Sequence, residues 1–117
     1  MHIDVSERDG TTVVKPAGNR IDIEVAGELR NTLLKLIDEG SRKLVVDLGE
    51  VSFIDSSGLG ALVSALKRLR ASEREGDIRL ANVQAPVVGL LEIIRLHRVF
   101  SSYPSVEAAA RSFVGSA

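Results

Sequence analysis

The stretch Lys43-Leu44-Val45-Val46-Asp47-Leu48 decides the fold, because it is the clearest β-strand of the chain. Its centre is an unbroken apolar run, which is typical of a central strand that is covered on both faces. Helical patterns lie on both sides of it, over residues 22–39 and from about Ser56 onward. Alternation of strands and helices predicts an α/β fold with a mixed, mainly parallel sheet and right-handed crossovers.

The residues before this strand predict a hairpin and one helix. Ile3 and Val5 alternate with polar neighbours, and Asp9-Gly10 marks a turn before a second extended run at residues 12–15. The helix is expected over residues 22–39, with Asp22 as its N-cap and Gly40 as its stop. One face of this helix carries Val25, Leu29, Leu33, Leu36 and Ile37.

The residues after the central strand predict three more helices and two more strands. The helix from Ser56 is expected to end at Gly76, and a strand follows at residues 78–80. Pro86 fits the first turn of the next helix, where its missing N–H is not needed. A last short strand is expected at residues 98–100, and Ser105 is expected to cap the closing helix. The total is about five strands and about four helices.

Composition limits the range of functions. The 117 residues fit one domain spanning residues 1–117, with 44% hydrophobic and 26% charged side chains. A net charge of −1 and an aromatic content of 3% argue against direct nucleic-acid binding. The chain has no cysteine, its first residues are too charged for a signal peptide, and its apolar runs are too short for membrane insertion. We therefore expect a cytoplasmic protein.

The segment Phe53-Ile54-Asp55-Ser56-Ser57-Gly58-Leu59-Gly60 is the candidate functional loop. It lies between the central strand and the next helix, the place where open α/β sheets put their sites. An Asp or Ser at this point is often only a helix cap, and this simpler interpretation explains much of the loop. Two adjacent serines exceed what one cap requires, however. A phosphate on one of them would sit at the positive end of the helix dipole, so the loop is a candidate phosphoacceptor.

Enzymatic readings find less support, and no catalytic residue is predicted. A G-x-S-x-G nucleophile motif, a third glycine of a dinucleotide fingerprint and a Walker lysine are all missing around Ser56. His2 is terminal, and His97 is expected at the surface or at a helix end. Asp47 and Asp55 belong to no metal-ligand pattern, so neither a metal nor a cofactor is expected.

The loop and its surroundings resemble the STAS domain family, specifically the bacterial anti-sigma factor antagonists. The hallmark of that family is Asp-Ser-Ser/Thr-Gly-Leu-Gly after the central strand, which is matched by residues 55–60. Residues 45–48, 78–83 and 96–100 are similar to the central, following and last strands of the family, and a helix start follows at Ser105. The resemblance covers nearly the whole chain.

The resemblance implies a partner switch. Ser56 would be phosphorylated by an anti-sigma factor that is itself a serine kinase, and a PPM-type serine phosphatase would reset it. The unmodified form would bind the kinase and release the sigma factor, and the phosphorylated form would not. The implied partner-binding residues are Asp22, Asp55, Ser56, Ser57, Gly58 and Leu59. A binding module without enzymatic activity, present as a monomer or weak dimer, is the corresponding expectation.

Two positions depart from the pattern of the family. Asn19 stands where a glycine usually precedes the Arg-Ile-Asp segment, with Gly18 one position early. Asn tolerates a left-handed backbone better than most residues, so the turn is expected to survive. Arg95 stands where a glycine often precedes the final strand, which weakens the helix stop.

Other functions stay open on the sequence alone. One is a non-switching STAS subunit of a transport ATPase or of a stressosome-type assembly, whose interactions would not depend on Ser56. Another is an enzyme that uses Ser56 and His97. Weak nucleotide binding is a third, because a glycine-rich helix N-terminus can hold phosphate.

Overall fold

The computed structural model describes residues 2–113 and has one five-stranded sheet. The strand order is β1-β2-β4-β6-β7. The strands are β1 (Ile3–Arg8), β2 (Thr11–Pro16), β4 (Lys43–Asp47), β6 (Asp77–Ala81) and β7 (Ser102–Tyr103). Only the β1–β2 pair is antiparallel, and the other three pairs are parallel. The predicted α/β class and mainly parallel sheet are confirmed, with β4 at the centre.

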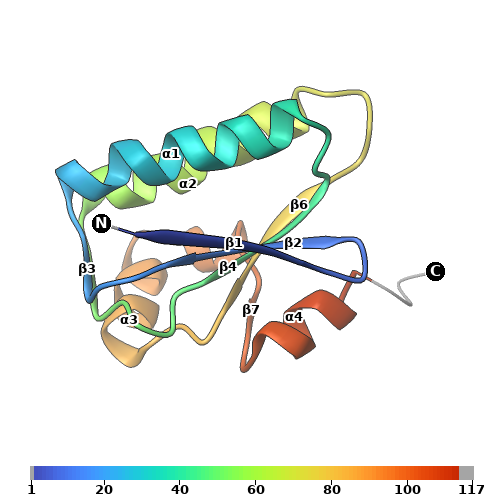
Figure 1. Ribbon diagram of the computed structural model, residues 1–117. Helices are drawn as coiled ribbons and strands as arrows, with labels where there is room; N and C mark the ends of the chain where they lie inside the picture. Colours follow the sequence, from blue (N-terminus) through green and yellow to red (C-terminus); the bar gives the residue numbers. More distant parts are fainter. Residues whose placement is uncertain (1, 114–117) are drawn as a thin grey trace.

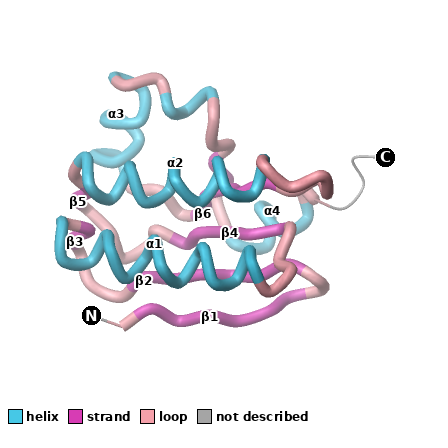
Figure 2. Tube along the Cα trace, turned by 90° about the horizontal axis from the view of Figure 1, so that it is seen from above, coloured by secondary structure: helices cyan, strands magenta, loops and turns pink. Residues whose placement is uncertain are grey.

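Helices cover both faces of this sheet (Figure 1). The helices α1 (Ile23–Asp38) and α2 (Ser56–Arg70) lie side by side on one face, and α4 (Val106–Arg111) lies on the other. Helix α3 (Ala85–Ile93), followed by the short 3-10 helix η1 (Leu96–Arg98), stands apart from the α1–α2 layer (Figure 2). The long α1–α2 layer therefore forms the main core with the sheet.

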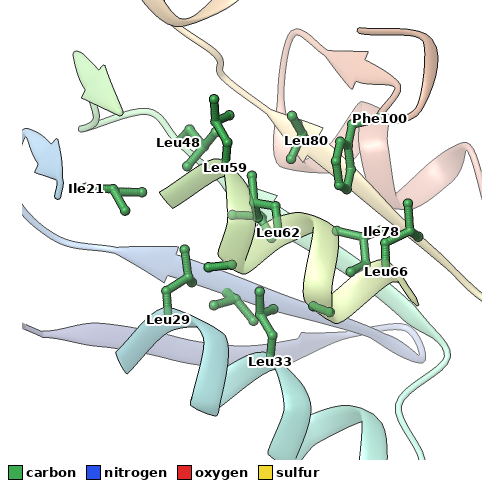
Figure 3. Close-up of a cluster of buried hydrophobic side chains, with 14 of the residues drawn as sticks. Ile21, Leu29, Leu33, Leu48, Leu59, Leu62, Leu66, Ile78, Leu80 and Phe100 are labelled. Atoms are coloured by element: carbon green, nitrogen blue, oxygen red, sulfur yellow. The ribbon is translucent and has the colours of Figure 1, made fainter. Parts of the chain in front are cut away.

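The core follows the period-two alternation of the strands. On β4, Leu44 and Val46 belong to the large cluster under α1 and α2, while Val45 between them belongs to a smaller cluster under α4. The large cluster includes Ile21, Leu29, Leu33, Leu48, Leu59, Leu62, Leu66, Ile78, Leu80 and Phe100 (Figure 3). Aliphatic side chains from both helices thus fill the space above the sheet.

The N-terminal hairpin and the first helix agree with the prediction from the sequence. Asp9 and Gly10 both have positive φ (50° and 83°), which is the backbone that a two-residue hairpin turn requires. Helix α1 begins after Asp22, and Gly40 adopts φ 114° directly after the helix. Of the five apolar residues expected on its inner face, Leu29, Leu33 and Ile37 are buried, and Val25 and Leu36 are partly buried.

Two boundaries in the second half were predicted wrongly. Helix α2 ends at Arg70 and not at Gly76. The backbone N–H of Arg74 donates to the Ser72 hydroxyl (3.2 Å), a local bond that competes with continuation of the helix. The last strand lies at residues 102–103 and not at 98–100, because the backbone N–H groups of residues 98–100 bond within the turns of η1, to the carbonyls of Arg95 and Leu96. Ser105 caps α4 as predicted, by accepting from Ala108 N at 3.0 Å.

Candidate functional site

A second, two-stranded sheet organises the candidate site, and the sequence did not predict it. The strands β3 (Arg20–Ile21) and β5 (Phe53–Ile54) are parallel, with Arg20 opposite Phe53 and Ile21 opposite Ile54. Each strand leads directly into a long helix through one aspartate, Asp22 before α1 and Asp55 before α2. Two-residue strands leave almost no periodic signal, which explains why they escaped prediction. The pairing brings the N-termini of α1 and α2 to the same end of the molecule (Figure 1).

Both aspartates are helix N-caps with similar geometry. Asp55 Oδ1 accepts from the backbone N–H groups of Ser57 (2.9 Å) and Gly58 (3.2 Å). Asp22 Oδ1 accepts from Glu24 N (3.1 Å) and Val25 N (3.4 Å). Each carboxylate satisfies backbone donors of the first helical turn and places negative charge at the positive end of the helix dipole. The simpler interpretation of Asp55 as a cap is therefore correct, and the tandem serine needs a separate explanation.

Ser56 is the first residue of α2, and its side chain lies at the surface. Ser57 is the next residue and is half-buried. The first-turn backbone N–H groups of Ser57 and Gly58 are already bound to Asp55, so the hydroxyl of Ser56 is not needed as a cap. Neither serine hydroxyl has a hydrogen-bond partner within residues 2–113, and Ser56 is the more exposed residue of the two. Ser56 is thus the serine of this loop that lies most openly at the surface.

Gly58 and Leu59 face the interior, although the motif places both at the partner surface. A Cβ at Gly58 would lie 2.6 Å from Ile54 Cγ1 and 2.8 Å from Ile21 Cγ2, so only a glycine lets α2 pack this closely on β3 and β5. Leu59 is 6% exposed and belongs to the main core. At Gly60, by contrast, a Cβ would meet nothing within 4 Å. Gly58 and Leu59 therefore pack the first turn of α2, which carries Ser56, against the interior. Both residues are too buried to form the outer surface.

Two exposed apolar side chains flank the loop. Ile23, the first residue of α1, is 74% exposed, and Phe53 of β5 is 43% exposed. The guanidinium of Arg20 lies 4.5 Å from the centroid of the Phe53 ring, a cation–π contact across the β3–β5 pair. The signal in the sequence that could have identified Ile23 is its place directly after a helix cap and off the inner face of α1. These residues give the loop an apolar rim.

The turn before β3 uses Gly18 and not Asn19 for the left-handed backbone. Gly18 has φ 93°, while Asn19 is absent from the positive-φ residues among positions 2–113. The Asn19 carbonyl instead accepts from the backbone N–H groups of Ser52 (2.9 Å) and Phe53 (3.1 Å). The early glycine therefore preserves the turn, and Asn19 connects it to the segment that carries Phe53. The other departure, Arg95, does adopt a left-handed backbone, at φ 63°.

Other candidate chemistry is not assembled in the described part of the chain. His97 is exposed in η1, with Nδ1 3.5 Å from the Leu91 carbonyl, and His2 is exposed beside Asp4. Asp47 is buried, and its Oδ1 accepts from Gly49 N (2.9 Å) and from Asn82 Nδ2 (3.1 Å). Within residues 2–113, no three His, Cys, Asp or Glu side chains are grouped to hold a metal ion. No helix of this part of the chain is both long and apolar enough to cross a membrane.

Comparison with known proteins assigns the family. The sequence profile of the STAS domain matches residues 2–109. The chain belongs to the STAS domain family. Among curated relatives of this STAS domain, the anti-sigma-B factor antagonist of Staphylococcus aureus is 33% identical over 75 residues, which is 64% of this chain and 68% of the relative.

Solved structures share the fold of this STAS domain at lower sequence identity. An anti-sigma-factor antagonist (STAS) domain protein from Planctomyces limnophilus superposes with a TM-score of 0.85 at 22% identity, covering 96% of this chain and 97% of that one. SpoIIAA, an anti-sigma factor antagonist solved in its unphosphorylated form, gives a TM-score of 0.73 at 18% identity, covering 99% and 100%. A Bacillus structure of SpoIIAA in the phosphorylated form gives 0.71 at 19% identity, covering 95% and 99%. At these identities the structures establish the fold alone.

Proposed function

We propose that this STAS domain is an anti-sigma factor antagonist that acts by partner switching through Ser56. The unmodified chain binds an anti-sigma factor kinase and releases the sigma factor, and phosphorylation of Ser56 ends that binding. The observation that carries the proposal is the exposed position of Ser56 at the start of α2, whose cap is already supplied by Asp55. The 33% identity to the anti-sigma-B factor antagonist of Staphylococcus aureus supports the same role.

The proposed binding surface consists of Asp22, Asp55, Ser56 and Ser57 with the apolar rim of Ile23 and Phe53. Aromatic residues are enriched in protein interfaces, and an exposed Phe53 beside polar groups fits that composition. Gly58 and Leu59 support this surface from the interior. In this proposal the partner contacts the neutral hydroxyl of Ser56. A phosphate on Ser56 therefore changes a direct contact of the interface.

The charge change is large enough to switch binding without unfolding the domain. A phosphate adds about −1.5 to −2 charges at neutral pH, and the carboxylate of Asp55 is already adjacent in sequence. The helix dipole favours that charge by about 0.3–1 kcal/mol in the free protein, so the fold tolerates it. In the complex, a loss of about 3 kcal/mol weakens binding more than 100-fold.

The test uses the two adjacent serines as target and control. The chain is incubated with ATP and the anti-sigma factor kinases of its own organism, and the modified position is read by mass spectrometry. We expect phosphate on Ser56 of the wild type, none on Ser56→Ala, and normal labelling of Ser57→Ala. Calorimetry should then show that the phosphorylated chain binds the same kinase at least 100-fold more weakly than the unmodified chain.

Three outcomes contradict the proposal. Labelling that persists in Ser56→Ala moves the acceptor to another residue. Equal affinity of the two forms removes the switch and favours a non-switching subunit of a larger assembly. Absence of any interaction with the kinases removes the partner itself.

A further inference from the structure

A pocket lies at the opposite end of α2 from Ser56. Its lining comes from the segment 71–76 between α2 and β6, from the end of α2 and from the beginnings of β4 and β6. Its volume is about 560 Å³, within the range of pockets that hold small molecules. Nothing in the proposed switch uses this pocket, since Ser56 and the apolar rim lie beyond the other end of the helix.

The lining of the pocket is basic. Five cationic and three anionic side chains line it, a formal charge of +2 on a chain whose total charge is −1. The cations are Arg42, Lys43, Arg70, Arg74 and Arg79, and the anions are Glu73, Glu75 and Asp77. The C-terminal end of α2 contributes a negative partial charge of about 0.5, which offsets only part of this excess.

Three of the cations have no acidic partner in the described part of the chain. Arg70 and Arg79 both pair with Asp77, at 3.6 Å and 3.1 Å. Among residues 2–113, no carboxylate oxygen lies within 4.0 Å of Arg42, Lys43 or Arg74. The positive charge of the pocket is therefore available to a ligand.

Arg42 provides the most specific observation. Its Nη2 donates to the Ile37 carbonyl at 2.8 Å, but its Nε and Nη1 are buried without a hydrogen-bond acceptor. Buried charged donors almost always have an acceptor, because leaving one unsatisfied costs free energy. Asp77 Oδ1 of the same lining is also buried without a hydrogen-bond partner, so the Arg42 side chain must shift before its Nε or Nη1 can bind an anion in the pocket.

The backbone holds the pocket in shape before any ligand arrives. Asp77 N donates to the Arg42 carbonyl at 2.9 Å, and a Cβ at Gly76 would lie 2.6 Å from that same oxygen. The segment from α2 thus closes tightly against the start of β4. Arg79 is fixed as well, by Ser112 Oγ (2.6 Å) and by the ring of Phe113, whose centroid lies 4.0 Å from its guanidinium carbon.

We propose that this pocket binds a small anion that carries two or more phosphate groups. Guanidinium forks match the paired oxygens of phosphate, and the four arginines of the lining can engage more than one group at a time. The volume exceeds what a single phosphate fills. The ligand class is therefore a polyphosphate or a small phosphorylated metabolite that Arg42, Lys43 and Arg74 hold by charge.

Calorimetry with sodium tripolyphosphate tests the proposal. Orthophosphate serves as the ligand with a single phosphate group. A nucleoside triphosphate shows whether a base adds affinity. We expect saturable 1:1 binding of tripolyphosphate, at least tenfold tighter than that of orthophosphate. Lys43→Gln/Arg74→Gln removes two exposed pocket charges and should weaken tripolyphosphate binding at least tenfold. The matched control Arg30→Gln/Arg98→Gln removes two exposed charges elsewhere and should change it less than twofold.

A second measurement distinguishes binding at this pocket from nonspecific electrostatic attraction to basic residues elsewhere. In amide NMR spectra, tripolyphosphate should shift the signals of Arg42, Gly76 and Asp77 and leave those around Ser56 unchanged. No binding at millimolar ligand, equal weakening in the control pair, or shifts spread over the whole basic surface would each overturn the proposal. Ser56→Ala should bind tripolyphosphate like the wild type, so failure here is independent of the partner switch.

Discussion

The substitution Gly58→Ala tests whether close packing under Ser56 holds the functional loop in place. The new Cβ would lie 2.6 Å and 2.8 Å from carbons of Ile54 and Ile21, whereas carbon atoms normally pack at about 3.5–4.0 Å. Both isoleucines are branched near the backbone and are fully packed, so the first turn of α2 must recede by about 1 Å. Overpacking of this kind costs about 1–3 kcal/mol. The better helix propensity of alanine offsets about 0.5–1 kcal/mol of this cost, so the net loss of stability is about 0–2.5 kcal/mol, with a central value of about 1 kcal/mol.

Gly60→Ala is the matched control in the same helix. A Cβ at Gly60 meets nothing within 4 Å, so only the gain of about 0.5–1 kcal/mol in helix propensity is expected. Urea denaturation of both variants measures the difference, because an m-value of about 2 kcal/mol per molar separates their midpoints by about 1 M. If Gly58→Ala gained stability as Gly60→Ala is expected to, the helix could recede freely and the packing argument would be refuted. Slower phosphorylation of Ser56 in Gly58→Ala alone would connect the packing to the proposed switch.

Two further predictions concern the ends of helices. Asp55→Ala should lower the free energy of unfolding by about 1 kcal/mol through loss of the cap, while Asp55→Asn, which keeps a capping oxygen, should lose less than half of that in thermal and urea melts. Equal losses in both variants would mean that the charge and not the cap matters. Arg95→Gly should raise the stability by up to about 1 kcal/mol, because Arg95 holds φ 63° where glycine is unstrained. A lower melting temperature for Arg95→Gly would show that contacts of the arginine outweigh that strain.

Prediction succeeded where a signal is local and periodic. The hairpin follows from alternation around Asp9-Gly10, and α1 follows from its cap, its apolar face and Gly40. Ser56 at the start of α2 was equally accessible to prediction, because a capping aspartate followed by an apolar helical period marks a helix start within a residue. The family resemblance came from the same local motif.

Prediction failed where long-range contacts decide the outcome. The strands β3 and β5 contain two residues each, and only their pairing across the chain makes them strands. The strand β7 also contains only two residues, Ser102 and Tyr103, and it is a strand because these residues pair with Leu80 and Ala81 of β6. The segment after α2 is likewise held by a long-range contact, because Asp77 N donates to the Arg42 carbonyl and Gly76 lies against that same oxygen.

The α/β class, the main strands and helices, the apolar face of α2 that includes Leu59 and the position of Ser56 at a helix start all follow from residues that are close in the chain. The close packing of Gly58 on Ile21 and Ile54, and the exposure of Ile23 and Phe53 beside Ser56, became evident only in the folded structure. It also placed five cations from separate segments around one pocket. Burial and proximity are properties of residues that meet across the fold, and no pattern along the chain encodes which ones meet.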